Sequence, residues 1–404
     1  MFTGGRKVEK ILDKKKRLEK ALGDVLQDAI DNCYLAGANI LVLKNGQEIA
    51  YCEAGYSDIE NSVKIKRDTI FRLYSMTKPV TGAAMMILLE RGLVDLADPV
   101  SKYLSGFMDQ HVVTEKGMVP VKRNMMIKDL LSMTSGLPYP GEDEASQEAA
   151  RVFLKIDENL YGDSPLTTRQ IANELGKCNL SFHPGEHWMY GTSADILGAV
   201  IEVVTDMKYG EFLKKEIFDP LGMEDTAFYV PADKQDRFAK LYDFVDGRFQ
   251  ELKTNNLGIQ YQMLKPPAFE SGGAGLASTV DDYARFATML LNYGELNGVR
   301  ILSKKTVEFF TKGELMSWQQ EDLWRNWETL QGYTYNNLMR IMKRPEMSFT
   351  LAEEGEYGWD GWLGTYFTNF PESNMTFLFM MQKKDSGTTD LTRRLRNILL
   401  KELP

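Results

Sequence analysis

Residues 71–80 read Phe-Arg-Leu-Tyr-Ser-Met-Thr-Lys-Pro-Val, and they predict a short β-strand that runs directly into an α-helix ending near Gly92. Ser75 stands at the start of this helix and Lys78 follows three residues later, so the two side chains share one helical face. A nucleophilic serine needs a base for its proton and donors for the oxyanion that forms on attack at a carbonyl. The unpaired N–H groups of a helix start can serve as such donors.

The Ser-x-x-Lys spacing is a weak signal by itself, because about one occurrence is expected by chance in a chain of this length. It occurs once here, at a strand-to-helix junction. The competing interpretation is that Ser75 only caps the helix and that Lys78 is a solvated lysine.

Composition describes an ordinary folded chain. It has 404 residues, of which 43% are apolar and 26% charged, which is enough for one large domain or two coupled domains. The net charge of −9 argues against binding to nucleic acid or to anionic lipid. Residues 1–20 are charged throughout and lack the pattern of a signal peptide, so we expect a cytoplasmic protein. Cys33, Cys52 and Cys178 are far apart, and we expect reduced thiols.

Strand signals lie at the two ends of the chain. Residues 7–32 predict an amphipathic helix, and residues 38–53 predict a β-hairpin that turns at Asn45-Gly46. A third short strand is expected at 69–73. Residues 358–382 predict an aromatic hairpin, and a final helix follows at about 388–403. The sequence therefore predicts an α+β fold, with one antiparallel sheet flanked by the N- and C-terminal helices.

The middle of the chain has few strand signals. We expect residues 95–215 to form a mostly helical subdomain, inserted into an α/β subdomain made of residues 1–94 and 216–404. Residues 142–147 are polar and acidic, which predicts an exposed loop. The functional site is expected in the cleft between the two subdomains.

Two features near the C-terminal half have alternative interpretations. Residues 271–279 read Ser-Gly-Gly-Ala-Gly-Leu-Ala-Ser-Thr, which we interpret as a tight turn capped by Ser278 or Thr279, not as a phosphate loop. Three tryptophans, at 318, 324 and 327, are expected to be buried on a helix, although exposed tryptophans there would suggest a substrate lid.

Two more stretches bear on chemistry. Residues 182–193 read Phe-His-Pro-Gly-Glu-His-Trp-Met-Tyr-Gly-Thr-Ser, which places Tyr190 just ahead of a helix, and residues 357–362 read Tyr-Gly-Trp-Asp-Gly-Trp. Together with Ser75-x-x-Lys78, a Leu-Gly-Met connector at 221–223 and the glycine turn, they make the chain resemble the serine β-lactamase and penicillin-binding-protein superfamily. The resemblance runs from about residue 30 to the C-terminus. It is strongest with class C β-lactamases and family VIII carboxylesterases.

The resemblance implies roles for these residues. Ser75 would be the nucleophile that carries the acyl group, and Lys78 and Tyr190 would transfer protons. Desolvation would lower the pKa of Lys78, and a nearby cation would lower the pKa of Tyr190. The backbone amides of Ser75 and Trp362 would form the oxyanion hole. No cofactor and no metal are expected.

The sequence departs from the penicillin-recognising pattern at two expected substrate contacts. Thr192 replaces an asparagine, and Trp359-Asp360-Gly361 replaces Lys-Thr-Gly. That lysine attracts the carboxylate of a β-lactam or peptide, whereas tryptophan carries no charge and Asp360 would repel an anion. Both departures favour neutral esters. We accordingly expect Trp359→Lys to leave ester turnover nearly unchanged.

The sequence therefore predicts a serine hydrolase of short-acyl carboxylic esters, with a small-molecule substrate, no nucleic-acid partner and no membrane association. One alternative is a β-lactamase, D-alanyl peptidase or D-aminopeptidase. A second is a catalytically silent ligand-binding protein of the same fold. Acyl transfer to an acceptor other than water stays open, and oligomeric state is not predicted.

Other catalytic patterns are weaker. There is no Gly-x-Ser-x-Gly elbow, and the three histidines at 111, 183 and 187 make a Ser-His-Asp triad improbable. Pro184-Gly185 separates two of the histidines, so they are expected to order a loop and not to bind zinc. Asp195 and Glu186 are interpreted as a cap and a surface residue.

Overall fold

The computed structural model describes residues 3–160 and 162–402, with side chains from residue 14 onward. The helices have these bounds: α1 Thr3–Asp31, α2 Thr77–Glu90, α3 Ile127–Leu131, α4 Glu144–Asn159, α5 Thr168–Gly176, α6 Ser193–Thr205, α7 Tyr209–Leu213, α8 Asp219–Leu221, α9 Val280–Leu291, α10 Lys304–Lys312, α11 Ser317–Asn326 and α12 Asp390–Glu402.

The strands have these bounds: β1 Gly37–Lys44, β2 Gln47–Asp58, β3 Val63–Lys64, β4 Phe71–Arg72, β5 His111–Thr114, β6 Gly117–Pro120, β7 Tyr242–Val245, β8 Arg248–Glu251, β9 Ala277–Ser278, β10 Glu295–Leu296, β11 Val299–Arg300, β12 Tyr333–Asn336, β13 Met339–Met342, β14 Tyr357–Asp360, β15 Tyr366–Phe370 and β16 Met375–Met381.

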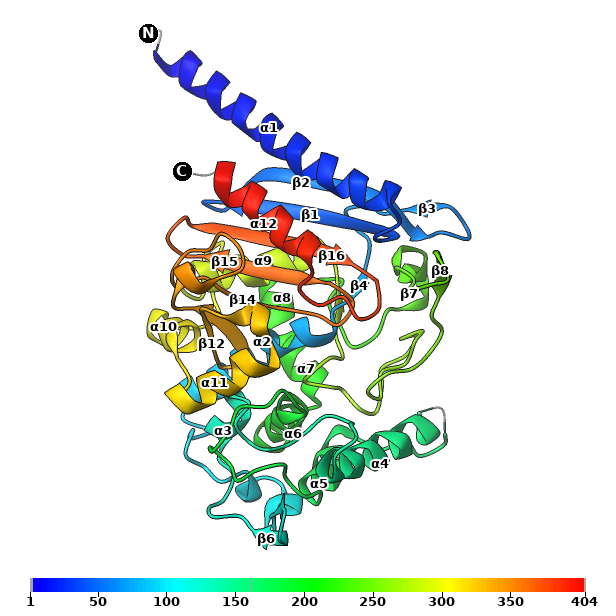
Figure 1. Cartoon of the computed structure of the whole chain (residues 1–404), viewed down its shortest axis with the longest axis vertical. Helices are drawn as coiled ribbons and strands as arrows, with labels where there is room; N and C mark the ends of the chain where they lie inside the picture. Colours follow the sequence, from blue (N-terminus) through cyan, green and yellow to red (C-terminus); the bar gives the residue numbers. More distant parts are fainter. Residues whose placement is uncertain (1–2, 161, 403–404) are drawn as a thin grey trace.

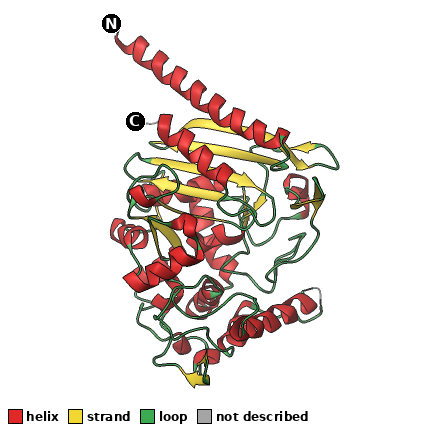
Figure 2. Cartoon of the chain, in the orientation of Figure 1, coloured by secondary structure: helices red, strands yellow, loops and turns green. Residues whose placement is uncertain are grey.

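One antiparallel sheet joins the two ends of the chain (Figures 1 and 2). Its order is β12-β13-β14-β15-β16-β1-β2-β3, and β1 pairs with β16 from Ala38 opposite Met381 to Lys44 opposite Met375. The predicted N-terminal hairpin and the predicted sheet with helices at both termini are confirmed.

Both faces of the sheet are covered, so its central strands are almost continuously apolar. On β1, Ile40 and Val42 pack in the cluster formed with α1 and α12, and Leu41 points to the opposite core. Figure 1 shows α1 and α12 along one face and α2 and α9 on the other side. The latter side contains the start of α2 and therefore Ser75.

Several sequence predictions need correction. The strand expected at 69–73 shortens to β4, which pairs with β9 and not with the main sheet. The hairpin expected at 358–382 has three strands and not two, because its first half divides into β14 and β15, which pair with each other. Residues 142–147 are no simple loop, because the Asp143 side chain accepts a hydrogen bond from the Ser146 N–H and caps α4. The helical region also contains the β5–β6 hairpin, whose few residues carry little strand periodicity.

None of the helices described here is long and apolar enough to cross a membrane.

A buried ion pair fixes α12 to the sheet. The Arg396 guanidinium donates to both carboxylate oxygens of Glu356, at 2.8 and 3.0 Å, and to the Tyr366 hydroxyl at 2.8 Å. The side chains of Arg396 and Glu356 are 1% and 0% exposed. Such a pair depends on both members, because either charge alone would be left in the core without compensation.

We predict that Glu356→Ala lowers the free energy of unfolding by about 3–5 kcal/mol, because it leaves the Arg396 charge unpaired. Asp28→Ala is the control, since its contact with Arg394 is 3.8 Å long between side chains that are more than half exposed, and its loss should cost less than about 1 kcal/mol. Urea unfolding of both variants measures the difference. Equal midpoints for the two would contradict this account of α12.

Candidate active site

The predicted nucleophile lies on a short 3₁₀ turn, Tyr74–Met76, that leads into α2. Tyr74 has a φ of 45°, a left-handed conformation that costs a tyrosine about 1 kcal/mol or more and needs support from its surroundings. Its ring packs against Trp362, with ring centroids 5.0 Å apart. Ser75 is partly exposed at this turn, whereas the residues on either side are buried.

Lys78 is completely buried directly behind Ser75. Its Nζ lies 3.2 Å from Ser75 Oγ, 2.9 Å from the Tyr139 hydroxyl and 2.8 Å from the Gly273 carbonyl oxygen. Burial lowers the pKa of Lys78 from 10.5 to about 7, although the charges of Asp195 and Asp360 act in the opposite direction. A substantial share of the lysine is therefore neutral at neutral pH.

The three partners suit a neutral amine. A neutral amine has two N–H donors and one lone pair. Tyr139 and Gly273 provide acceptors for the two N–H groups, which leaves the lone pair for the Ser75 hydroxyl. In this arrangement Ser75 donates its proton to the lysine nitrogen, the first requirement of a serine nucleophile. The capping interpretation is wrong, because Lys78 has no solvent exposure and the Ser75 side chain caps neither the 3₁₀ turn nor α2.

Tyr190 also packs against Lys78. Its ring centroid is 4.5 Å from Lys78 Nζ, and its hydroxyl accepts a 2.9 Å hydrogen bond from Trp359 Nε1. Burial raises the pKa of Tyr190, and the interactions with Ser75 and Trp359 offset this only in part. The expectation that a cation lowers the pKa of Tyr190 is therefore wrong. Tyr190 remains a neutral phenol, which can give a proton but is a poor base.

Two neighbours of the lysine were missed in the sequence. Tyr139 follows α3 in an irregular segment that has no periodic signal. Asp195, interpreted as a cap, instead accepts hydrogen bonds from Ser271 Oγ at 2.6 Å and the Gly273 N–H at 3.0 Å. It thereby holds the glycine turn whose carbonyl contacts Lys78. That turn was interpreted only as a structural turn, and Thr279 does cap α9.

Glycine allows the Tyr190 segment to reach this position. A Cβ on Gly191 would lie 1.8 Å from the Leu137 carbonyl oxygen, so no other residue fits without moving the backbone. The contact joins the segment before α6 to the segment that contains Tyr139. The rings of Tyr139 and Tyr190 lie 5.7 Å apart as a result.

The end of β14 approaches the same turn. A Cβ on Gly361 would lie 2.2 Å from the Leu73 carbonyl oxygen, which shows how closely this strand end meets the Ser75 turn. Thr365 strengthens the contact, because its hydroxyl donates to the Leu73 carbonyl at 3.0 Å. Trp362, the next residue, packs its ring against that of Tyr74, the neighbour of Ser75. The oxyanion role of the Trp362 amide stays a prediction.

Trp359 is part of an aromatic cluster and is only 2% exposed. The centroid of its ring lies 4.9 Å from the ring centroid of Tyr335, 5.5 Å from that of Tyr190 and 5.9 Å from that of Trp327. A lysine at this position would place a charge inside the cluster and remove the donor to Tyr190. The structure therefore argues against the expectation that Trp359→Lys leaves ester turnover nearly unchanged.

Asp360 and Thr192 were also expected to contact substrate. Asp360 is paired, with Arg340 Nη1 at 3.4 Å and the Thr388 hydroxyl at 2.8 Å, so its charge is partly offset and repels an anion less than expected. Thr192 is completely buried, and its hydroxyl has no hydrogen-bond partner within the described part of the chain. A substrate contact with Thr192 stays a prediction.

The histidines order a loop, as predicted. His187 Nδ1 lies 2.9 Å from Asp322 of α11, and His183 Nδ1 accepts from the Lys122 N–H at 3.3 Å. Glu186 is a surface residue that pairs with Lys122. Among the side chains of residues 14–160 and 162–402, there is no group of three or more His, Cys, Asp or Glu that could hold a metal ion.

The tryptophans in and next to α11 differ in solvent exposure. Trp318 is 54% exposed, whereas Trp324 and Trp327 are half-buried against the core. Trp327 packs against the site, because its ring centroid lies 5.0 Å from that of Tyr190.

Comparison with known proteins shows the family. The family model described as Beta-lactamase matches residues 22–401, and the chain belongs to this family. Esterase EstB of Burkholderia gladioli is 31% identical over 293 residues, which are 66% of this chain and 69% of that protein. A putative D-alanyl-D-alanine carboxypeptidase of Salmonella typhimurium is 27% identical over 389 residues, or 89% of this chain and 82% of that protein.

Solved structures share this fold. The solved structure described as EstCE1, a hydrolase with promiscuous acyltransferase activity, superposes with a TM-score of 0.79. It is 24% identical, and the match covers 95% of this chain and 99% of that one. The predicted β-lactamase and penicillin-binding-protein fold is confirmed.

We predict that the reactivity of Ser75 rises with pH through about 7. Below that pH Lys78 is protonated and cannot accept the serine proton, and above it the amine is neutral. The rate of labelling by a fluorophosphonate, followed from pH 5 to 9 by intact-protein mass spectrometry, measures this rise. Asp195→Asn should move the midpoint of the rise to lower pH, because the Asp195 charge raises the pKa of Lys78. A flat profile would show that Lys78 does not control the serine.

Proposed function

We propose that the protein is a serine hydrolase that cleaves short-acyl carboxylic esters through an acyl-enzyme on Ser75. The observation that carries the proposal is the buried amine of Lys78, which has two neutral acceptors for its N–H groups and Ser75 Oγ 3.2 Å from its nitrogen. A lysine in this state can take the serine proton at neutral pH without a histidine.

In the proposed acylation step, the Ser75 proton moves to Lys78 Nζ while Oγ forms a bond to the ester carbonyl carbon. The carbonyl oxygen becomes an oxyanion, which the backbone N–H groups of Ser75 and Trp362 stabilise. The tetrahedral intermediate collapses by breaking the bond to the alkoxy oxygen. The Tyr190 phenol protonates this leaving oxygen and recovers its proton from Lys78. In deacylation, water attacks the acyl carbon and gives a proton to Lys78 Nζ. The bond to Ser75 Oγ then breaks, Oγ takes a proton from Tyr190, and the carboxylic acid is released.

Two features support a neutral ester as the substrate. The position of the anion-attracting lysine is filled by Trp359, which is packed in an aromatic cluster and supplies no charge. The rings of Tyr190, Trp327 and Trp359 pack on one another next to Lys78, and we take this crowding to favour short acyl groups. An esterase at 31% identity supports the same assignment.

We predict that Ser75→Ala abolishes hydrolysis of p-nitrophenyl butyrate, and that Lys78→Ala and Tyr190→Phe each lower kcat by about 10²–10⁴. Lys128→Ala is the matched control, since it removes an exposed lysine on α3 and should leave turnover unchanged. Near-normal turnover in Lys78→Ala or Tyr190→Phe would contradict the assigned proton path.

The same assay separates the alternatives. A chromogenic cephalosporin and a peptide ending in D-alanyl-D-alanine are tested beside the ester. If only the cephalosporin or the peptide were turned over, the ester assignment would be wrong. Folded protein that Ser75-directed fluorophosphonate cannot label would instead indicate a silent binding protein.

We further predict that Trp359→Phe lowers kcat for the ester about 3–10-fold, because one hydrogen bond to the Tyr190 hydroxyl is worth about 0.5–1.5 kcal/mol. Trp359→Lys should be worse, since it also buries a charge. Steady-state kinetics with p-nitrophenyl butyrate checks both, with circular dichroism to show that the variants are folded. An unchanged kcat in Trp359→Phe would remove the indole from the mechanism.

A further inference from the structure

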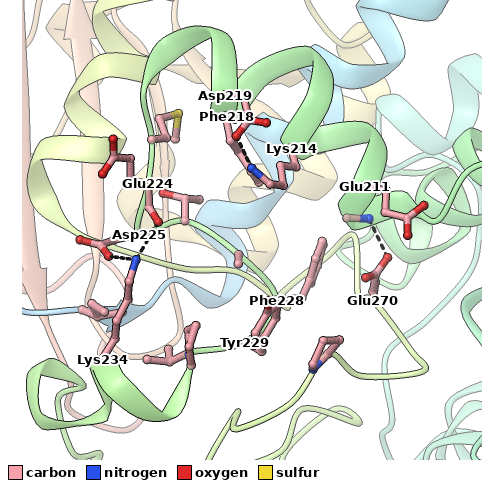
Figure 3. Close-up of a pocket in the computed structure, with 18 of the residues that line it drawn as sticks. Glu211, Lys214, Phe218, Asp219, Glu224, Asp225, Phe228, Tyr229, Lys234 and Glu270 are labelled. Carbon is pink, nitrogen blue, oxygen red and sulfur yellow. Dashed lines mark hydrogen bonds and ion pairs between the residues drawn. The ribbon is translucent and has the colours of Figure 1, made fainter.

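A cavity of about 520 Å³ opens beside α7, apart from the residues that surround Ser75. Ser75, Lys78 and Tyr190 are not among its lining residues. Figure 3 shows its two ends, with Glu270 at one and the Lys234–Asp225 pair at the other. Its wall is mostly apolar and is formed by Phe218, Met223, Phe228, Tyr229, Val230 and Pro231.

Glu270 is the unusual charge of this cavity. The residue is 6% exposed, and its Oε2 accepts a 2.6 Å hydrogen bond from the Gly210 N–H. Its Oε1 has neither a hydrogen-bond nor an ion-pair partner among the residues described. Three lysines line the cavity. Lys214 pairs with Asp219 and Lys234 pairs with Asp225, and among the residues described Lys208 makes no ion pair with Glu270.

An aromatic ring lies next to this carboxyl group. A Cβ placed on Gly210 would be 2.7 Å from Glu270 Oε1 and 3.0 Å from the Phe228 ring, so the two groups flank the same point. A carboxylate beside an aromatic ring is an arrangement that attracts an ammonium ion, through a charge-assisted hydrogen bond and the ring quadrupole.

The surroundings of Glu270 disfavour its ionised form. Burial raises the pKa of Glu270 to about 7, and the neighbouring Glu202 and Glu211 also raise it. The Gly210 N–H and Lys208 act in the opposite direction without restoring the ordinary value. A ligand that brings a positive charge stabilises the ionised carboxyl group, whereas an anionic ligand adds to the repulsion.

We propose that this cavity is a second binding site, for a small organic ammonium ion that carries an apolar or aromatic body, and that binding there is linked to Lys78 through the glycine turn. The ammonium group would donate to Glu270 Oε1 beside Phe228. The apolar body would lie along Met223 and Val230.

The link follows hydrogen bonds within the chain. Glu270 directly precedes Ser271-Gly272-Gly273. The Gly273 carbonyl accepts from Lys78 Nζ at 2.8 Å, and the Gly272 carbonyl accepts from the Thr81 hydroxyl at 2.6 Å. The Thr81 hydroxyl also contacts the Tyr209 hydroxyl at 2.6 Å, and Tyr209 is the neighbour of Gly210. A shift of Glu270 toward a ligand therefore acts on both ends of the turn that holds the lysine.

Binding is tested by isothermal titration calorimetry with 2-phenylethylammonium, using the Ser75→Ala protein so that the result does not depend on the proposed ester activity. We expect saturable binding at pH 8, and weaker binding of the neutral analogue 2-phenylethanol and of the anion 3-phenylpropionate. Glu270→Gln keeps an acceptor for Gly210 but loses the charge, and it should weaken binding of the amine about tenfold or more. Asp233→Asn, which removes an exposed carboxylate that does not line the cavity, is the matched control and should change binding less than about twofold.

Equal binding of the amine and the alcohol, or unchanged affinity in Glu270→Gln, would overturn the proposed site. The linkage is read from the rate of fluorophosphonate labelling of Ser75 in the otherwise unchanged protein. Saturating amine should change this rate at least about twofold, and should not change it in Glu270→Gln. An identical rate with and without bound amine would overturn the link to Lys78.

Discussion

Removal of the Lys78 amine from water is the constraint on which the site depends. A buried ammonium ion is costly, so burial shifts the lysine toward its neutral form. The neutral form still needs partners for two N–H groups, and they come from separate segments: Tyr139 after α3 and Gly273 before α9. The remaining lone pair faces Ser75. Any rearrangement that admitted water to Nζ would restore the charge and remove the base.

The rest of the fold places these partners. The main sheet joins strands from both ends of the chain, and β14 meets the Ser75 turn through the contact of Gly361 with Leu73. Asp195 on α6 holds the glycine turn, and Gly191 lets the Tyr190 segment rest on Leu137. Distant segments therefore meet around one amine. The aromatic cluster around Trp359 occupies the place where an anion-binding lysine would stand, and it connects the fold to the proposed preference for neutral esters.

Much of this arrangement was predictable from the sequence, for physical reasons that can be named. Helical spacing predicted that Ser75 and Lys78 would meet, and periodic apolar patterns predicted the terminal helices and the hairpin at Asn45-Gly46. Tyr139 was not predictable, because its segment has no periodicity and its role arises only from a contact with a residue 61 positions away. The pKa of Tyr190 was predicted in the wrong direction, because its burial among other rings is a tertiary property. The pairing of Asp360 with Arg340 was missed for the same reason.

The central claim is that Lys78 loses its proton near pH 7, and direct titration of its side chain tests it. The protein is labelled with ¹³C at lysine Cε, and the Lys78 resonance is assigned by its loss in Lys78→Met. Our account predicts that this resonance titrates with a midpoint near pH 7. A midpoint near 10.5, the ordinary value for lysine, would contradict it.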